Sequence, residues 1–277
     1  MNVLINYADE KYHKVQRLNS LSGRMFGGFD KVIEYGPDDI DCKFKVENIK
    51  ILENKRGNGL WLWKPYFILK TLNTLEDGDV LFYCDSAAFF VRKIKAVLEI
   101  LKNQDIWISA LPLIEKQFTQ PSVFETLGCN EEKYTESPQL SGSFIAFKKS
   151  NWSIDFVKEW LKYCCNKNIL DCDNEKEVII RVQYPFFISH REDQSVLSLL
   201  AKKYGVKEYQ DPSQYSIFPE KYVRGTREAH FYAKYDYKPF IVHHRKSNIA
   251  IIDFLLQTIY VLLPYRIARK VFLARAE

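Results

Sequence analysis

The chain has 277 residues, of which 47% are hydrophobic and 15% aromatic, so it can bury a substantial core and a disordered or fibrous class is excluded. Its 40 Lys and Arg residues exceed its 35 Asp and Glu residues by only five, a balance that suits an anionic small substrate or an anionic membrane surface. With no zinc-finger spacing and no repeated basic–aromatic pattern, the sequence argues against a nucleic-acid partner.

The hydrophobic pattern predicts strands and helices that alternate along most of the chain. The predicted strands cover residues 2–6, 31–36, 80–85, 105–113, 142–149 and 238–246. The predicted helices cover residues 11–26, a segment from about Pro65 to 75, 93–103, 150–166 and 193–205. The polar, irregular stretch 115–140 is predicted to be a loop.

This alternation predicts a single α/β domain with a mainly parallel central sheet flanked by helices. Ligands of such sheets bind at the carboxyl ends of the strands. Tyr7, Asp85, His243 and His244 come at such ends. An unpaired buried carboxylate is costly, so we expect Asp85, which ends the apolar run "VLFYCD", to face a cleft.

The six cysteines contain no C-x-x-C pair, and their spacing does not suit zinc. The start of the chain, "MNVLINYADEKYH", lacks the basic-then-apolar form of a signal peptide. We therefore expect free thiols and a cytoplasmic location.

Two blocks give a more specific indication, "RGNGLWLWKPYFILKTLNTLEDGDVLFYCDSA" (56–87) and "HREDQSVLSLL" (190–200). They resemble blocks of bacterial capsule and lipopolysaccharide glycosyltransferases of the GT-A type, and the resemblance spans most of residues 1–248. It implies a GT-A-like domain that moves a hexose from a nucleotide-diphosphate sugar, UDP-linked, to a surface polysaccharide or lipid-linked oligosaccharide. The metal and nucleotide-sugar motif of that superfamily is usually Asp-x-Asp, whereas "CDSA" has one acid, Asp85.

The donor side of such a site must stabilise the charge of a departing diphosphate, with a divalent ion or with cationic side chains. The candidate donor residues are Tyr7, Arg17, Lys64, Asp85, Ser86, His243, His244 and Lys246. Asp85 and His244 are also the candidate ligands of Mn²⁺ or Mg²⁺, with donor phosphate oxygens completing the shell. Each has a simpler alternative: "HHRK" (243–246) can be a solvated strand end, Lys64 a core residue whose ammonium reaches water, and Tyr7 and Arg17 ordinary surface residues.

The acceptor side is predicted at the start of the helix that follows "HRE". Asp193, or secondly Glu192, is the candidate general base or acceptor ligand, although Asp193 can also be a helix cap. The resemblance adds Gln194, because Asp193 and Gln194 match an Asp-Gln element near the acceptor site of several GT-A families. Gln139 and Ser141 are candidate acceptor-wall residues, or simply the start of a strand.

Residues 249–277 differ in composition from the rest and are predicted to be a separate C-terminal segment. The apolar part, 249–263, is shorter than the roughly 20 residues that span a bilayer. The part that follows carries Arg266, Arg269, Lys270 and Arg275 against Glu277. This pattern predicts an amphipathic helix on the cytoplasmic face of a membrane; the alternative is a helix packed on the domain or on a second subunit.

Two other functions compete with glycosyl transfer. A sugar-phosphate nucleotidyltransferase needs a G-x-G-x-R loop after its first strand, and "YADEKYHK" contains none. A non-catalytic carbohydrate-binding module would keep the aromatic residues, but it has no need for Asp85, Asp193 and a His pair at strand and helix ends.

Overall fold

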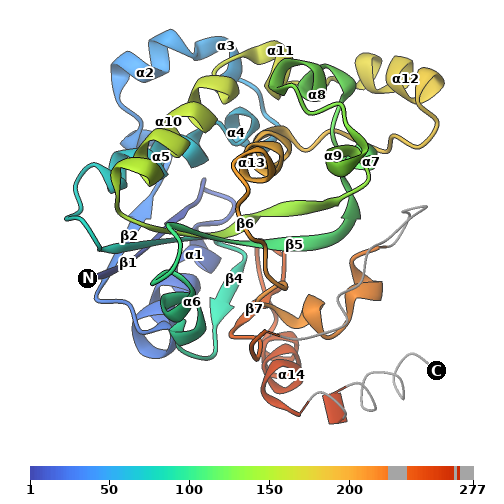
Figure 1. The fold of residues 1–277 in the computed structure, drawn as a ribbon. Coiled ribbons are helices and arrows are strands. Elements are labelled where there is room, and N and C mark those ends of the chain that lie inside the picture. The colour runs from blue at the N-terminus through green and yellow to red at the C-terminus, as the bar shows by residue number, and fades with distance from the viewer. Residues whose placement is uncertain (224–235, 265–266, 269–277) are drawn as a thin grey trace.

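The computed structural model describes residues 1–223, 236–264 and 267–268. Its centre is a five-stranded sheet in the order β2-β1-β3-β6-β5 (Figure 1). The strands are β1 (Asn2–Tyr7), β2 (Lys31–Tyr35), β3 (Val80–Cys84), β5 (Ile106–Ile114) and β6 (Pro138–Lys148). β1 pairs in parallel with β2 and β3, whereas β6 runs antiparallel to both β3 and β5. Four strands therefore share one direction, and the predicted mainly parallel sheet is confirmed.

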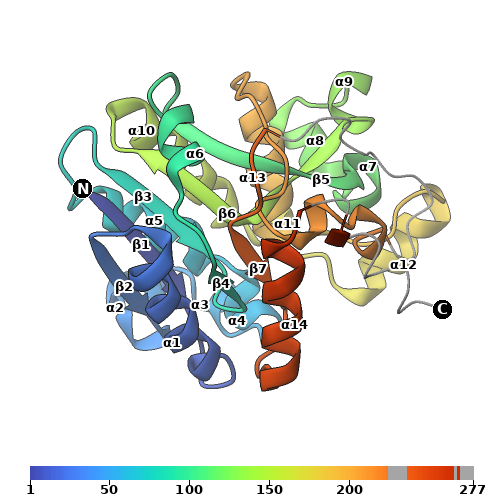
Figure 2. The same ribbon diagram turned by 90° about the horizontal axis from the view of Figure 1, so that it is seen from below.

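Helices cover one face of this sheet, and helices with a small second sheet cover the other (Figures 1 and 2). The first face carries α5 (Trp63–Leu72), α10 (Asn151–Cys164) and α13 (Glu192–Lys203). The second carries α1 (His13–Ser22), α6 (Lys95–Ile100) and the pair β4 (Ala88–Phe90) and β7 (Ile241–His243). Side chains of β3 alternate between the two layers, so Tyr83 packs in the first core cluster and Phe82 in the second. The predicted α/β class is thus confirmed.

The remaining elements are mostly short. They are a π-helical turn (Gly23–Gly27), 3-10 turns (Pro37–Asp39, Gln214–Ser216, Pro219–Lys221), α2 (Cys42–Glu47), α3 (Ile49–Leu52), α4 (Gly57–Leu60), α7 (Glu115–Phe118), α8 (Pro121–Leu127), α9 (Glu132–Thr135), α11 (Lys167–Leu170), α12 (Asn174–Gln183) and α14 (Ile251–Leu262).

The predicted loop over residues 115–140 is wrong, because this stretch contains α7, α8, α9 and the start of β6. Several of its polar residues are buried and find partners inside the protein, while others face water. The buried Glu115 carboxylate accepts hydrogen bonds from Thr119 at 2.6 Å and from Ser198, and pairs with Lys202. Short helices with buried polar side chains leave no helical hydrophobic pattern, so their sequence resembles that of a loop.

The last strand, β7, lies outside the main sheet, where it pairs antiparallel with β4, and Ala88 is aligned with His243. The backbone amides of His244 and Arg245 both donate to the Ala87 carbonyl at 3.1 Å. This pairing brings the segment after β7 beside the segment that follows Asp85.

Helix α14 packs one side against the β4–β7 sheet. The rings of Phe254 and Phe89 are 4.6 Å apart, and the Arg92 guanidinium donates to the carbonyls of Val261 and Leu262. No helix in the part of the chain that the structure describes is long and apolar enough to cross a membrane. The four basic residues after it (Arg266, Arg269, Lys270 and Arg275) lie outside the described residues.

Candidate functional site

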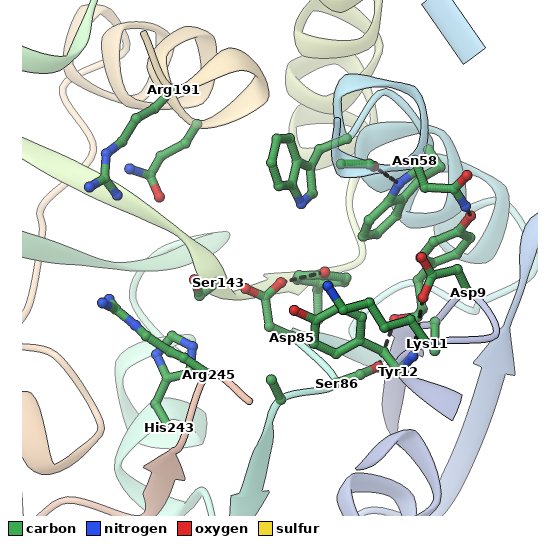
Figure 3. Close-up of a pocket in the computed structure, with 18 of the residues that line it drawn as sticks. Asp9, Lys11, Tyr12, Asn58, Asp85, Ser86, Ser143, Arg191, His243 and Arg245 are labelled. Atoms are coloured by element: carbon green, nitrogen blue, oxygen red, sulfur yellow. Dashed lines mark hydrogen bonds between the residues drawn. The ribbon is translucent and has the colours of Figure 1, made fainter. Parts of the chain in front are cut away.

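A cleft of about 490 Å³ opens at the carboxyl ends of β1 and β3 (Figure 3). Its lining comes from segments far apart in the sequence: the β1–α1 connection, α4, the end of β3, β6, the start of α13 and the end of β7. The lining residues are Tyr7, Ala8, Asp9, Lys11, Tyr12, Lys55, Gly57, Asn58, Trp61, Trp63, Tyr83, Asp85, Ser86, Ala87, Ser143, Arg191, Gln194, Tyr222, His243 and Arg245.

Asp85 lies near the middle of this cleft in the view of Figure 3, and its side chain is 29% exposed. The Tyr83 hydroxyl donates to Asp85 Oδ1 at 2.6 Å, and the Asp85 amide donates to the Ser143 carbonyl at 2.9 Å. The Ser86 hydroxyl donates to the Tyr7 carbonyl at 2.6 Å, which ties the end of β3 to the end of β1. Asp85, the lone acid of "CDSA", therefore faces the cleft and has hydrogen-bond partners. This agrees with the expectation that an unpaired buried carboxylate would be too costly.

Lys64 is buried at the start of α5 and lies between two carboxylates. Its ammonium is 3.0 Å from Asp193 Oδ2 and 3.9 Å from Asp85 Oδ1, and it sits 5.3 Å from the centre of the Tyr83 ring. The side chains of Lys64 and Asp193 are each 5% exposed, and neither lines the cleft. Lys64 is thus a buried counter-ion behind Asp85, not a snorkelling lysine, and Asp193 lies behind Lys64.

Burial and charge act against each other in this cluster. Burial lowers the pKa of Lys64, but the Asp193 and Asp85 carboxylates together raise it by more, so the ammonium stays charged. Burial raises the pKa of Asp193 to about 6, although the Lys64 charge opposes this rise. A general base, the predicted role of Asp193, must contact the substrate. In this geometry Asp193 does not line the cleft and instead holds the Lys64 ammonium.

The aromatic wall of the cleft is built on an unusual backbone. Five consecutive residues, Gly57 to Trp61, have φ between 51° and 95°, and two of them are Leu60 and Trp61, for which this region is unfavourable. The turn folds the Trp61 ring over Gly57, so closely that a Cβ on Gly57 would lie 2.3 Å from a ring atom. Such strain is typical of functional segments held by their surroundings.

Tyr7 belongs to this wall, but one face of its ring is occupied. The rings of Tyr7 and Trp63 stack with centres 3.8 Å apart, and the Asn58 amide donates to the Tyr7 hydroxyl. Tyr7 is buried, whereas Trp61 is only partly buried. If a planar base or sugar face stacks on this wall, Trp61 is therefore the more accessible ring, and stacking on Tyr7 stays a prediction.

The "HHRK" cluster does not act as one basic patch. His243 lines the cleft but is held neutral, since burial and then the Arg245 charge lower its pKa well below the ordinary value. His244 lies outside the lining, with burial lowering its pKa to about 4, and Lys246 pairs with Asp253 at 2.6 Å. Of the four residues only Arg245 brings a charge to the cleft.

The described residues do not by themselves form a metal site. They contain no group of three or more His, Cys, Asp or Glu side chains that could hold an ion. One oxygen of Asp85 already accepts from Tyr83, and His244 Nδ1 accepts from the Lys246 amide at 3.2 Å. A divalent ion at Asp85 would need most of its ligands from the donor or from water, and metal dependence stays a prediction.

On the predicted acceptor side, only Gln194 reaches the cleft. The Gln194 amide donates to the buried Gln139 Oε1 at 2.8 Å, and the Gln139 amide donates to Glu115 Oε1 at 3.1 Å. Ser141 is also buried, and its hydroxyl accepts from the Ser143 amide at 3.2 Å. Gln139 and Ser141 therefore support the wall from behind.

Two further candidates do not line the cleft. Glu192 is buried and pairs with Arg56 at 2.6 Å, and burial raises its pKa to about 8. Arg17 is exposed on α1 and is not among the lining residues. Sequence reasoning placed the aromatics of "WLWKP" (61–65) at a sugar or phosphate site or in the core, but gave no role to Tyr83, Arg191, Tyr222 or Ser143, which all line the cleft. The run of Gly and Asn before "WLW" was the available signal for a special turn at Trp61.

No protein-family model matches this sequence, and no curated protein matches it. Among solved structures, the apo form of mouse xyloside xylosyltransferase 1 has a TM-score of 0.46 and 10% sequence identity over 88% of this chain and 97% of that chain. GlyE, a glycosyltransferase of Streptococcus pneumoniae TIGR4, has a TM-score of 0.43 and 10% identity over 99% of this chain and 64% of that chain. The bifunctional glycosyltransferase WbbM has a TM-score of 0.40 and 10% identity, and covers 71% of this chain and 36% of that chain. Likenesses this distant assign no role to any residue.

Proposed function

We propose that the protein is a glycosyltransferase that moves a hexose from a nucleotide-diphosphate sugar, UDP-linked, to a glycan or lipid-linked acceptor. One observation carries the proposal: a partly exposed carboxylate, Asp85, ends a buried parallel strand in a cleft with an aromatic wall and several cationic side chains. The GT-A resemblance of residues 56–87 and 190–200 supports the same reading.

Under this proposal the nucleoside lies at the end of β1, where Lys11 and Tyr12 line the cleft, the diphosphate extends past Asp85, and the sugar folds back over Asp85. Asp85 orients the sugar or the diphosphate, and Tyr83 fixes the carboxylate through its hydroxyl. The acceptor enters beside Gln194 and Ser143. Asp193 acts through Lys64: it holds the ammonium in place, and the ammonium balances the charge of Asp85.

The acceptor and the location are also proposals. Helix α14 exposes a row of large apolar side chains on the side that does not pack on the domain, namely Ile251, Ile252, Leu255, Ile259 and Leu262. Such a row, followed in sequence by four basic residues, suits the anionic face of a membrane. A membrane-bound position would bring the cleft to a lipid-linked oligosaccharide of a surface polysaccharide, on the cytoplasmic side.

A donor screen tests the proposal. The purified protein is incubated with a panel of nucleotide sugars, with EDTA or with Mn²⁺, and the released nucleoside diphosphate is measured. We expect release from UDP-linked hexoses above the rate without protein, and its loss in the Asp85→Asn variant. No release and no nucleotide binding across the whole panel would refute glycosyl transfer.

A further inference from the structure

Two guanidinium groups line the cleft without forming an ion pair, although the buried Asp211 lies near enough for its charge to act on Arg245. In the part of the chain that the structure describes, neither Arg191 nor Arg245 has a carboxylate within ion-pair distance, whereas Arg56 pairs with Glu192 and Arg181 with Glu177. Both lie at the same end of the cleft in the view of Figure 3, on the side of Asp85 away from Lys11. Unpaired guanidiniums in a partly enclosed cleft create a strong preference for an anion.

Aromatic rings hold both groups in place. The Arg191 guanidinium carbon is 4.7 Å from the centre of the Phe118 ring, and that of Arg245 is 4.0 Å from Tyr222 and 4.7 Å from Tyr215. Stacking on a ring immobilises a guanidinium but leaves its N–H donors free at the edge. The backbone of Arg245 also has a φ of 59°, an unfavourable conformation that the Ala87 contact helps to hold.

Among the residues that the structure describes, the other cations near this end of the cleft are already neutralised. Lys64 is engaged by Asp193 and Asp85, and Lys246 by Asp253. His243 is neutral. Of the described side chains, Arg191 and Arg245 are therefore the charges left for a ligand there, and planar guanidiniums suit the oxygens of a phosphate.

We propose that Arg191 and Arg245 form a phosphate subsite that binds the diphosphate of the nucleotide donor, an inference that rests on the proposed function. In the transfer, the bond from the anomeric carbon to the β-phosphate oxygen breaks and its electron pair stays on that oxygen. The anomeric carbon bonds to the acceptor oxygen, and one proton is released to solvent. The two guanidiniums stabilise the charge that the departing diphosphate gains, so that binding of the diphosphate does not depend on an ion at Asp85.

Calorimetric titration with uridine, UMP and UDP, each in EDTA and in Mn²⁺, tests the subsite. We expect the wild type to bind UDP more tightly than uridine in EDTA. Arg191→Gln and Arg245→Gln should each weaken UDP binding about tenfold to a hundredfold and leave uridine binding unchanged, since each removes charged hydrogen bonds. Arg181→Gln, which removes a guanidinium elsewhere, is the matched control.

The outcomes separate the subsite from the proposed function. If the wild type binds uridine and UDP equally, or if both Arg variants bind UDP as the wild type does, the subsite is refuted while nucleotide binding stands. If UDP binds only with Mn²⁺ and the Arg variants retain that binding, the charge comes from the ion and the subsite is again refuted. If no nucleotide binds, the proposed function falls and the subsite with it. Arg245→Lys, which keeps the charge, checks for a folding defect in Arg245→Gln: partial recovery of UDP affinity supports the subsite.

Discussion

The ammonium of Lys64 lies 3.0 Å from the Asp193 carboxylate, with both side chains buried, and only 3.9 Å from Asp85 at the edge of the cleft. A buried lysine thus links the start of α13 to the end of β3. The acid that faces the cleft and the acid that does not are coupled through one cation, and several predictions depend on this link or on its surroundings.

Lys64→Met should destabilise the protein by about 3–5 kcal/mol, because it leaves the Asp193 carboxylate buried without its cation. Adding Asp193→Asn should recover part of the loss, since a neutral amide costs less to bury. Urea unfolding measures both variants. Lys158→Met is the control: its pair with Asp155 is exposed, and we expect a change of about 0–1 kcal/mol. A Lys64→Met loss no larger than that of the control would contradict the buried pair.

Asp85→Asn keeps the size of the side chain but removes its charge. We expect the affinity for the nucleotide-sugar donor to fall by at least about tenfold, with the same unfolding midpoint. Tyr83→Phe removes the hydroxyl that orients the carboxylate and should give a smaller loss in the same direction. Titration of donor affinity measures both, with the exposed Asp77→Asn as control. Full donor affinity in Asp85→Asn would mean that the cleft is not the donor site.

Gly59→Ala should destabilise the protein more than Gly205→Ala. Both glycines have positive φ, 95° and 66°, so both substitutions place alanine in an unfavourable region. A Cβ at Gly59 would also lie 3.0 Å from the Leu52 backbone, whereas at Gly205 it meets nothing within 4 Å. Thermal unfolding measures the difference, and a donor titration shows whether the Trp61 wall is disturbed. Equal losses would mean that the turn can relax around the added methyl.

Glu192 should make stability depend on pH. Its folded pKa of about 8 lies above its ordinary value, so between about pH 5 and 8 the folded state binds more protons than the unfolded state. The stabilisation is therefore present at low pH and is lost as the pH rises through 8. Relative to Glu192→Gln, the wild type should lose free energy of unfolding from pH 5 to pH 8 and then level off. If the free energy of unfolding of the wild type, relative to Glu192→Gln, instead rises with pH, the ion pair with Arg56 stabilises the Glu192 carboxylate by more than burial destabilises it.

The apolar row on α14 should bind anionic membranes. We expect Ile252→Asp and Leu255→Asp to reduce sedimentation with phosphatidylserine-containing vesicles, because a charge there cannot enter the lipid interface. Val182→Asp, on the exposed side of α12, is the control for loss of an exposed apolar group. These variants are more informative than deletion of residues 249–277, since Phe254 packs on Phe89 and deletion would uncover the domain. Wild-type protein that stays in the supernatant would contradict the membrane proposal.

The sequence by itself determined the layers of the fold and the place of one key residue. The short apolar runs at 2–6 and 80–85 predicted buried strands, and the helices between them favoured parallel pairing. Asp85 could be placed at the edge of a cleft because an unpaired carboxylate cannot continue a buried strand. The N-cap of α10 also has a local origin, since the Ser150 side chain accepts from the Ser153 amide.

Only the tertiary structure decided what the charged side chains do. Whether Lys64 reaches water or becomes a counter-ion depends on Asp193, which is distant in sequence and is brought beside it by the packing of α13. In "HHRK", the pairing of β7 with β4 and the positive φ of Arg245 direct the Arg245 guanidinium into the cleft. Lys246 forms an ion pair with Asp253 instead. The charge state and burial of a site residue depend on contacts between segments distant in the sequence. The local hydrophobic periodicity does not predict such contacts.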